Sequence, residues 1–320
     1  KHLDEEVARL HLDKIGAKRV VIDTLETLFS CFPNPDVIRW ELRRLFGWLK
    51  QKRVTSIVTG ERGEKTLTRF GIEEYVSDCV IVLDHRITEQ MSTRRLRVLK
   101  YRGSMHGTNE YPFLIGQKGI SVLPITSSGL RHVASDARIS SGIPALDDMM
   151  GGKGYFLGSS VLISGTAGCG KTSIAARFTE AACRRGERCL NFLFEESPSQ
   201  LIRNMQSIGI DLAPHIEQGL FHIHAVRPSL QGLEMHLAVM QKMVDEISPQ
   251  IVVIDPISSF GALGSAIEIR AMLVRLIDFL KVKNITTVLT SLSRAGEALE
   301  RTETEISSLI DTWLMLRDIE

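Results

Sequence analysis

The chain has 320 residues, 43% of them hydrophobic and 24% charged, and a formal net charge of +1 at pH 7. This length predicts about two domains of ~150 residues each. A charge so close to zero gives no field that would select nucleic acid or an anionic membrane. The sequence contains neither an apolar run of the ~18 residues that a membrane helix needs nor a secretory signal. We expect a cytoplasmic protein with no nucleic-acid or membrane partner, and a start at Lys1 that suggests a fragment of a longer chain.

The cysteines are scattered and lack the paired spacing of a metal site. We expect them to be reduced thiols in a cytosolic protein. They are Cys31, Cys79, Cys169, Cys183 and Cys189.

Three segments of the first half recur in the same order in the second half. The spacing agrees as well: Asp23 precedes Asp78 by 55 positions, and Asp255 precedes Asp311 by 56. Two related domains are therefore expected. The paired segments are 18–29 with 249–260, 54–62 with 285–294, and 75–83 with 309–316.

Apolar runs rich in β-branched residues alternate with helical stretches along the chain. Such runs read as buried parallel strands, and the alternation predicts an α/β fold with helices on both faces of the sheet. A stretch of small polar residues at 125–140 marks the border, which gives domains 1–130 and 131–320. Both domains are expected to be incomplete, because the first lacks a phosphate loop and the second lacks a counterpart of residues 99–113. The expected helices are 36–51, 172–185, 232–247 and 266–283.

Residues 160–173 read as a strand, the motif GxxxxGK[ST] and the start of a helix. In this context the motif is typical of a phosphate-binding loop. The glycines let backbone N–H groups face a phosphate, Lys171 reaches the β- and γ-phosphates, and Thr172 ligates Mg²⁺. A turn that binds nothing is the weak alternative. The expected ATP contacts are Gly165, Thr166, Ala167, Gly168, Cys169, Gly170, Lys171, Thr172 and Ser173.

Carboxylates follow two of the expected strands. Asp255 ends the run at 251–255, at the sheet edge where open α/β folds bind ligands, and suits a magnesium-holding role. Glu195 and Glu196 end the strand at 191–197, where adjacent side chains point opposite ways. One of them could accept a proton from water or a hydroxyl near a nucleotide. The alternatives are a turn aspartate and a solvated glutamate pair.

A basic segment lies at 99–106 in the first half. Lys100 and Arg102 are two apart and are expected to share one strand face, with His106 close behind. Paired cations suit phosphate, although a solvated basic edge strand gives the same pattern.

These motifs together resemble the duplicated RecA-like ATPases of the KaiC group. The segments that carry this resemblance are the loop at 165–173, "FEES" at 194–197, "VVID" at 252–255 and "LKYRGSMHGTNEYPF" at 99–113. The resemblance covers essentially the whole chain. It implies two tandem RecA-like P-loop domains and homohexameric double rings with Mg·ATP at the subunit interfaces. It also implies ATP hydrolysis by the N-terminal domain, serine/threonine autophosphorylation by the C-terminal domain, stacking of rings and regulation by Kai-type clock proteins.

The resemblance also assigns roles to single positions. Glu195 and Glu196 match the catalytic pair, with Glu195 beside Thr172 as a Mg²⁺ ligand. Ser307 and Ser308 match the phosphorylation sites, although a serine pair before a strand is more often a simple cap. Thr302 matches an auxiliary hydroxyl. The first-domain group that reaches a neighbouring subunit's ATP is Lys100, Tyr101, Arg102, Ser104 and His106, with Glu61 and Arg62 in an interface segment.

Several positions depart from the familiar cyanobacterial clock proteins. The acceptor pair is Ser-Ser rather than Ser-Thr, Pro256 follows the aspartate, Ile208 replaces an adenine-stacking aromatic residue, and the loop at 293–305 differs. These departures suggest a homologue from outside the cyanobacteria and bear on regulation more than on ATP binding.

Two other functions remain open from the sequence. RecA-like domains also drive nucleic-acid motors, but such proteins add basic, aromatic-bearing loops, and the loop at 258–268 has neither Lys nor Arg. A signalling scaffold that binds ATP to assemble and turns over slowly would have a similar sequence.

Overall fold

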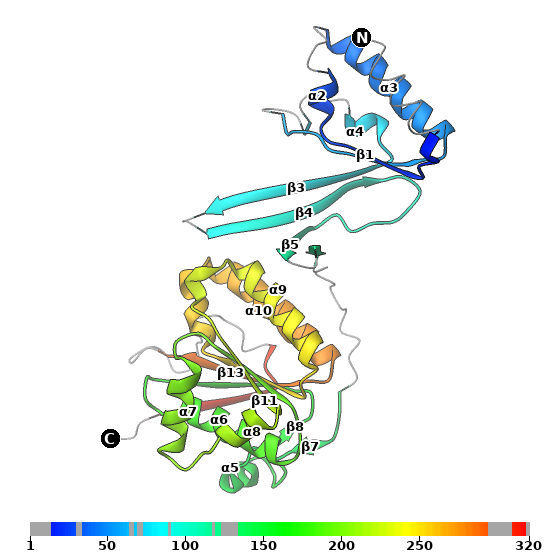
Figure 1. The fold of residues 1–320 in the computed structure, drawn as a ribbon. Coiled ribbons are helices and arrows are strands. Elements are labelled where there is room, and N and C mark those ends of the chain that lie inside the picture. The colour runs from blue at the N-terminus through cyan, green and yellow to red at the C-terminus, as the bar shows by residue number, and fades with distance from the viewer. Residues whose placement is uncertain are drawn as a thin grey trace. The chain divides into compact units, whose positions relative to one another are not determined.

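The computed structural model describes residues 14–29, 34–63, 67–68, 73–88, 91–116, 119–122, 134–293 and 309–317. The chain divides into two compact units (Figure 1). The first comprises Lys1–Leu83 and Arg97–Glu110, and the second comprises Asp84–Leu96 and Tyr111–Glu320. Within the described ranges, no helix is long and apolar enough to cross a membrane.

The first unit is built around a short parallel strand pair. Strand β1 (Arg19–Ile22) pairs with β2 (Thr55–Val58), and helix α3 (Pro35–Gln51) connects them. The side chain of Asn34 caps the helix, and Leu25, Ile38 and Leu42 are buried in a small core beside it. Helices α2 (Leu25–Phe29) and α4 (Glu73–Val76) also belong to this unit.

A four-stranded sheet has the order β3-β4-β5-β6. Its strands are β3 (Cys79–Thr88), β4 (Met91–Tyr101), β5 (Glu110–Gly116) and β6 (Gly119–Val122).

The two units repeat one local design, as the duplicated sequence predicts. In the first, the Thr59 hydroxyl donates to Asp23, and Lys50 pairs with Asp78 at 2.8 Å. In the second, the Thr290 hydroxyl donates to Asp255, and Lys281 pairs with Asp311 at 2.8 Å. In each unit the first aspartate follows or ends a parallel strand, and the lysine lies near the end of the connecting helix. The expected relationship between the halves is therefore borne out at the level of side-chain contacts.

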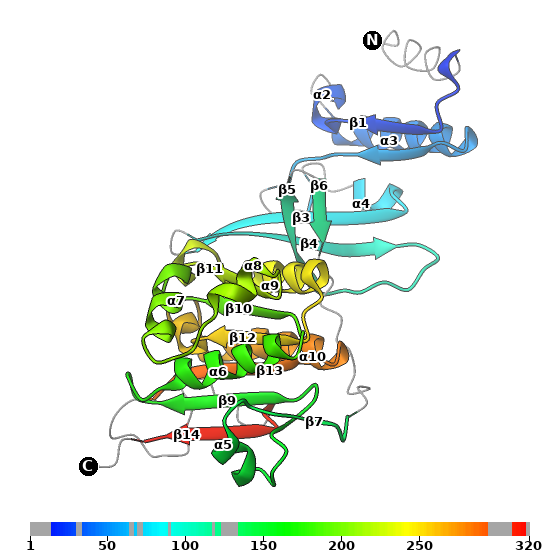
Figure 2. The same ribbon diagram turned by 60° about the horizontal axis from the view of Figure 1, so that its bottom comes forward.

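The second unit has a six-stranded parallel sheet in the order β11-β10-β12-β13-β9-β14. Figure 2 shows β14 beside β9 at one end of this sheet. The predicted α/β class with a mostly parallel sheet is therefore confirmed. The strands are β9 (Ser160–Gly165), β10 (Cys189–Leu193), β11 (Phe221–Ala225), β12 (Ile251–Asp255), β13 (Thr286–Leu292) and β14 (Thr312–Leu316).

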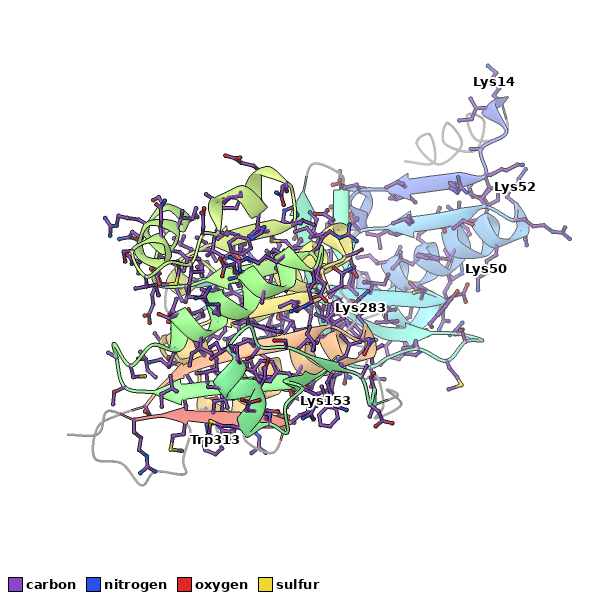
Figure 3. The ribbon with its side chains drawn as sticks, turned by 90° about the horizontal axis from the view of Figure 1, so that it is seen from below. Lys14, Lys50, Lys52, Lys153, Lys283 and Trp313 are labelled. Atoms are coloured by element: carbon purple, nitrogen blue, oxygen red, sulfur yellow. The ribbon has the colours of Figure 1, made fainter. Side chains whose placement is uncertain are left out.

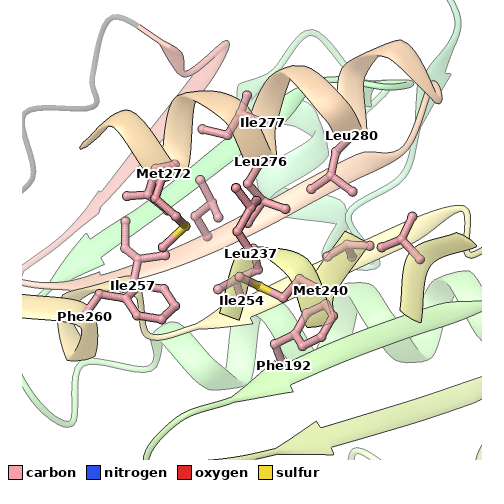
Figure 4. Close-up of a cluster of buried hydrophobic side chains, with 14 of the residues drawn as sticks. Phe192, Leu237, Met240, Ile254, Ile257, Phe260, Met272, Leu276, Ile277 and Leu280 are labelled. Atoms are coloured by element: carbon pink, nitrogen blue, oxygen red, sulfur yellow. The ribbon is translucent and has the colours of Figure 1, made fainter. Parts of the chain in front are cut away.

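Helices cover both faces of this sheet because its central strands are apolar on both sides. Along β12, Val252 and Ile254 face a core with α9 (Leu233–Ile247) and α10 (Ala266–Val282), which Figure 4 shows in close-up. Ile251 and Val253 face the opposite core with α6 (Lys171–Arg184) and α7 (Pro198–Gln206). The four predicted helices agree with α3, α6, α9 and α10 to within one residue at each end.

Short elements complete the second unit around the sheet. They are β7 (Arg138–Ile139), α5 (Pro144–Met149), β8 (Tyr155–Phe156), α8 (Ala213–Glu217), and the 3-10 helices η1 (Pro228–Leu230) and η2 (Ile257–Ala262). Since all six main strands are parallel, their carboxyl ends lie at one edge, and the predicted site residues follow several of these ends.

Candidate functional site: a phosphate loop and three carboxylates

The loop between β9 and α6 has the backbone of a phosphate-binding loop. Gly168 and Gly170 adopt left-handed φ values of 82° and 95°, which glycine reaches without a steric penalty. Helix α6 begins at Lys171, whose buried ammonium donates to the carbonyl oxygens of Gly165 at 3.0 Å and Thr166 at 2.6 Å. Turn amides, a helix N-terminus and an ammonium group therefore converge on one small volume, the combination that binds phosphate.

Gly165 is fixed by the packing of the sheet. A Cβ at this position would lie 2.5 Å from the Cys169 sulfur and 2.8 Å from the carbonyl oxygen of Leu316. The latter contact arises because β14 pairs with β9 up to Gly165. Trp313, labelled on β14 in Figure 3, adds a hydrogen bond from its indole N–H to Ser164 at 2.7 Å. The start of the phosphate loop is thus held by the last strand of the unit.

Asp255 stands at the end of β12 with its carboxylate facing the loop. Its Oδ2 accepts from the Thr172 hydroxyl at 2.8 Å, and its Oδ1 accepts from the Thr290 hydroxyl. Burial raises the pKa of this carboxyl, hydrogen bonds from both threonines oppose the rise, and the charge of Glu195 adds to it. The loop threonine and the strand-end aspartate therefore touch, as a shared role at one magnesium ion requires.

The two glutamates lie beyond strand β10 rather than on it. The strand ends at Leu193, and residues 194–196 form a bend, so the expectation that the pair belongs to the strand is wrong. The reason is a capping box directly behind them: Ser197 caps α7 and exchanges hydrogen bonds with Gln200. A capped helix start requires the chain to leave the sheet before it.

The bend gives the two carboxylates different surroundings. Glu195 Oε1 accepts from the Ser259 hydroxyl at 2.7 Å, in the 3-10 helix η2 that follows the neighbouring strand β12. Glu196 Oε2 accepts from the Asn204 amide of α7 at 3.4 Å. Burial raises the pKa of Glu196, and the charges of Asp255 and Glu195 raise it further, against the Asn204 hydrogen bond.

The donor atoms at this edge suit a hard divalent cation. Burial and the charge of Glu195 raise the pKa of Asp255, and burial and the charges of Asp255 and Glu195 raise the pKa of Glu196, so a cation would relieve this repulsion. Among the described residues, no cluster of three or more His, Cys, Asp or Glu side chains is arranged to hold a metal by itself. Mg²⁺ normally takes one or two protein ligands and completes its shell with phosphate and water oxygens. The residues therefore fit a magnesium ion that arrives with a nucleotide.

In the first unit, the predicted cationic group lies at the end of β4 and in the loop behind it. Arg102 lies in the turn just past Tyr101, so the expectation that Arg102 and Lys100 share a strand face is wrong. Its guanidinium lies 3.4 Å from Asp78 and donates to the Tyr75 carbonyl at 3.1 Å. Ser104 and His106 follow in the loop.

Comparison with protein families decides the classification. The family model described as "ATPase: KaiC" matches residues 1–127 and 139–318. The chain belongs to the KaiC family. Membership accounts for the duplicated design and for the phosphate loop beside a strand-end aspartate.

Individual relatives in the KaiC family are similar along nearly the whole chain. "Circadian clock protein KaiC2" of Synechocystis sp. is 53% identical over 310 residues, which are 96% of this chain and 55% of that protein. "Circadian clock oscillator protein KaiC 1" of Synechocystis sp. is 37% identical, over 96% of this chain and 60% of its own length. "Circadian clock oscillator protein KaiC" of Synechococcus elongatus is 36% identical, over 97% and 60%. The chain thus spans little more than half the length of these KaiC relatives.

Some site residues that the KaiC resemblance implies lie outside the described ranges, namely Ser307, Ser308 and Thr302. Conversely, sequence reasoning missed three residues that hold the carboxylates: Thr290, Ser259 and Asn204. Thr290 could have been found, because Thr59 occupies the same place in the first copy of the repeat. Asn204 lies outside the repeated segments, and Ser259, although within 249–260, belongs to no phosphate-site motif.

Proposed function

We propose that this chain is part of a ring-forming ATPase of a circadian or timer system, with serine autokinase activity in its second domain. In this proposal the second unit binds Mg·ATP between the phosphate loop and the carboxylates. Lys171 and the loop amides take the phosphates, while Thr172 and Asp255 hold the magnesium ion, with Glu195 as a further ligand. The names of the similar proteins, which call them circadian clock proteins, support the biological setting.

One observation carries the proposal: the Thr172 hydroxyl lies 2.8 Å from Asp255 Oδ2, at the sheet edge where Glu195 and Glu196 also end. A threonine and an aspartate in contact behind a phosphate loop are suited to one magnesium ion. Bound with ATP, the ion would neutralise charge on the phosphates. One of the glutamates would accept the proton of the attacking water or serine hydroxyl.

The remaining parts of the proposal concern assembly. We place the domain border at residues 130 and 131, supported by the two separate matches of the family model, 1–127 and 139–318. The subunits form homohexamers with ATP at their interfaces, and such rings can stack and bind Kai-type regulators. Lys100, Tyr101, Arg102, Ser104 and His106 contact the nucleotide of a neighbouring subunit, in support of which Arg102 is held in place by Asp78. The proposed location is the cytoplasm, in keeping with the free thiols of Cys79, Cys169, Cys183 and Cys189.

In the second domain the proposed acceptors are Ser307 and Ser308. A phosphate on either would add about 1.5–2 negative charges, enough to alter a subunit interface. Leu309 and Asp311, just behind this pair, are tied to β9 through Ser160, so the acceptor segment ends at a fixed point.

The test combines nucleotide binding with phosphate transfer. Wild-type protein should bind a fluorescent ATP analogue with Mg²⁺, and incubation with γ-labelled ATP should place label within residues 301–312. Lys171→Ala should abolish both, whereas Lys283→Ala, at the exposed end of α10, should change neither. Protein that binds and hydrolyses ATP without label in 301–312 would refute the kinase part alone. Protein that does not bind Mg·ATP would refute the whole proposal.

A further inference from the structure

Glu195 lies outside the helices and strands, so no regular backbone hydrogen bonding fixes its position. It is exposed, it follows the end of β10 by two residues, and its backbone belongs to a bend. A glutamate in such a place samples several rotamers, and most of them do not serve a directed proton transfer. Some contact must therefore select one position if Glu195 is to work at the carboxyl edge of the sheet.

The Ser259 hydroxyl supplies such a contact. Its Oγ donates to Glu195 Oε1 at 2.7 Å, a length typical of a strong hydrogen bond to a charged acceptor. Ser259 lies in η2, four positions after the aspartate that ends the neighbouring strand β12. The carboxylate is thereby tied to the strand that carries Asp255.

Two buried aromatic residues, one next to each partner of the Ser259–Glu195 hydrogen bond, pack against each other and fix the backbone there. Phe194, directly before Glu195, and Phe260, directly after Ser259, are 2% and 0% exposed and meet with ring centroids 4.6 Å apart. The Phe194 amide also donates to the Asp255 carbonyl at 3.0 Å. The geometry of the serine–glutamate pair is thus set by the core beneath it.

The other glutamate is held from a different side and less closely. Glu196 accepts its hydrogen bond from the Asn204 amide N–H on α7 at 3.4 Å, while the amide oxygen of the same asparagine accepts from Arg203. The two carboxylates are therefore separated, with Glu195 tied to the end of β12 and Glu196 directed to α7.

We propose that Ser259 is a positioning residue that fixes the Glu195 carboxylate for phosphate chemistry at this site. The inference rests on the proposed ATPase function and adds to it a residue outside the recognised motifs. Ser259 touches neither substrate nor metal in this role, and it acts only through Glu195. Its loss should therefore lower turnover and leave nucleotide affinity in place.

The adjacent serine provides a matched control. Ser258 also has a hydroxyl hydrogen bond, but it accepts from the backbone amide of Leu292 at 3.2 Å rather than donating to a carboxylate. Ser259→Ala should reduce kcat for ATP hydrolysis about tenfold, equivalent to about 1.4 kcal/mol, with the Kd for Mg·ATP within twofold of wild type. Ser259→Thr should restore most of the rate, and Ser258→Ala should stay within twofold of wild type.

Double variants test whether Ser259 affects turnover through Glu195 or through Glu196. In a Glu195→Gln background, Ser259→Ala should cause no further loss, whereas in a Glu196→Gln background the full tenfold loss should remain. An active wild type whose Ser259→Ala variant keeps its kcat, or loses it equally in both backgrounds, would overturn this inference alone. A wild type that binds Mg·ATP but does not turn it over would overturn the proposed ATPase function and this inference with it.

Discussion

The repeated ion pair allows a comparison within one molecule, because the same pair occurs once exposed and once embedded. Lys50–Asp78 and Lys281–Asp311 both have N–O distances of 2.8 Å, but the side-chain exposures are 55% and 49% in the first pair and 14% and 40% in the second. Asp311 also accepts from the amide and the hydroxyl of Ser160, which is 1% exposed. Truncating the two aspartates to alanine should therefore have very different effects.

The magnitude follows from what each truncation leaves behind. Asp311→Ala leaves a buried amide without its acceptor, which costs about 1–3 kcal/mol, and leaves a mostly buried ammonium without its carboxylate. We expect a total of about 2–4 kcal/mol. Asp78→Ala frees Lys50 and Arg102 to be solvated, and an exposed pair is worth at most about 1 kcal/mol after screening.

Thermal unfolding monitored by single tryptophans is the assay. Trp313 reports on the second unit and Trp40 or Trp48 on the first. Asp311→Ala should lower the midpoint of the second unit by about 4–16 °C, taking about 2–4 °C per kcal/mol for a unit of its size. Asp78→Ala should lower the free energy of unfolding of the smaller first unit by less than half as much. Equal losses of unfolding free energy, or a larger one for Asp78→Ala, would refute the reasoning from burial.

The pH dependence of the same pair has a fixed sign. Burial alone would raise the pKa of Asp311, but hydrogen bonds from Lys281 and Ser160 hold it below the usual value of 3.8. A depressed pKa gives stability that is present above about pH 4 and is lost as the pH falls through the folded-state value. The difference between wild type and Asp311→Ala should therefore shrink in acid; a difference that persists undiminished at pH 2 would contradict this.

Three further outcomes concern the nucleotide site. Asp255→Asn should raise the melting temperature of the ligand-free protein. Burial raises the pKa of the Asp255 carboxyl, so its ionised form destabilises the folded state above that pKa, and the neutral amide removes this cost. A lower melting temperature would contradict this. The same variant should lose the stabilisation that Mg·ATP gives to the wild type. Gly165→Ala should cost about 1–3 kcal/mol in urea unfolding, because its Cβ would meet the Leu316 carbonyl at 2.8 Å; adding Cys169→Ala should rescue little, since the backbone contact remains. Lys171→Arg should bind Mg·ATP at least tenfold more weakly in equilibrium titration, because the longer guanidinium does not fit the buried position of the ammonium; unchanged affinity would count against that position.

The architecture could be predicted because its signals are local. Helix α10 begins at Ala266, directly after the Ser265 cap, and ends within one residue of the expected end. Strand β12 is a run of five buried residues with an aspartate at its end, and the phosphate loop requires a strand before it and a helix after it. Each of these features is decided by neighbouring residues, which a sequence displays directly.

The details of the site could not be predicted in the same way. The bend at 194–196 depends on competition between strand continuation and the capping box of α7, and the apolar pattern alone favoured continuation. The Ser259–Glu195 bond joins residues 64 positions apart, and the Lys281–Asp311 bond joins residues 30 apart. Such contacts depend on how the strands pair, which periodicity does not specify.

Turnover of Mg·ATP by the wild type and by a Glu195→Gln/Glu196→Gln variant tests the central claim most directly. Both proteins should still bind Mg·ATP through Lys171, Thr172, Asp255 and the loop, with a weaker Kd for the variant because Glu195 no longer contributes a charged ligand to the ion. We predict that phosphate release, including transfer to the chain itself, falls at least a hundredfold in the variant, as expected when a general base is removed. Equal turnover by the two proteins would contradict the assignment of the site's chemistry to the carboxylates after β10.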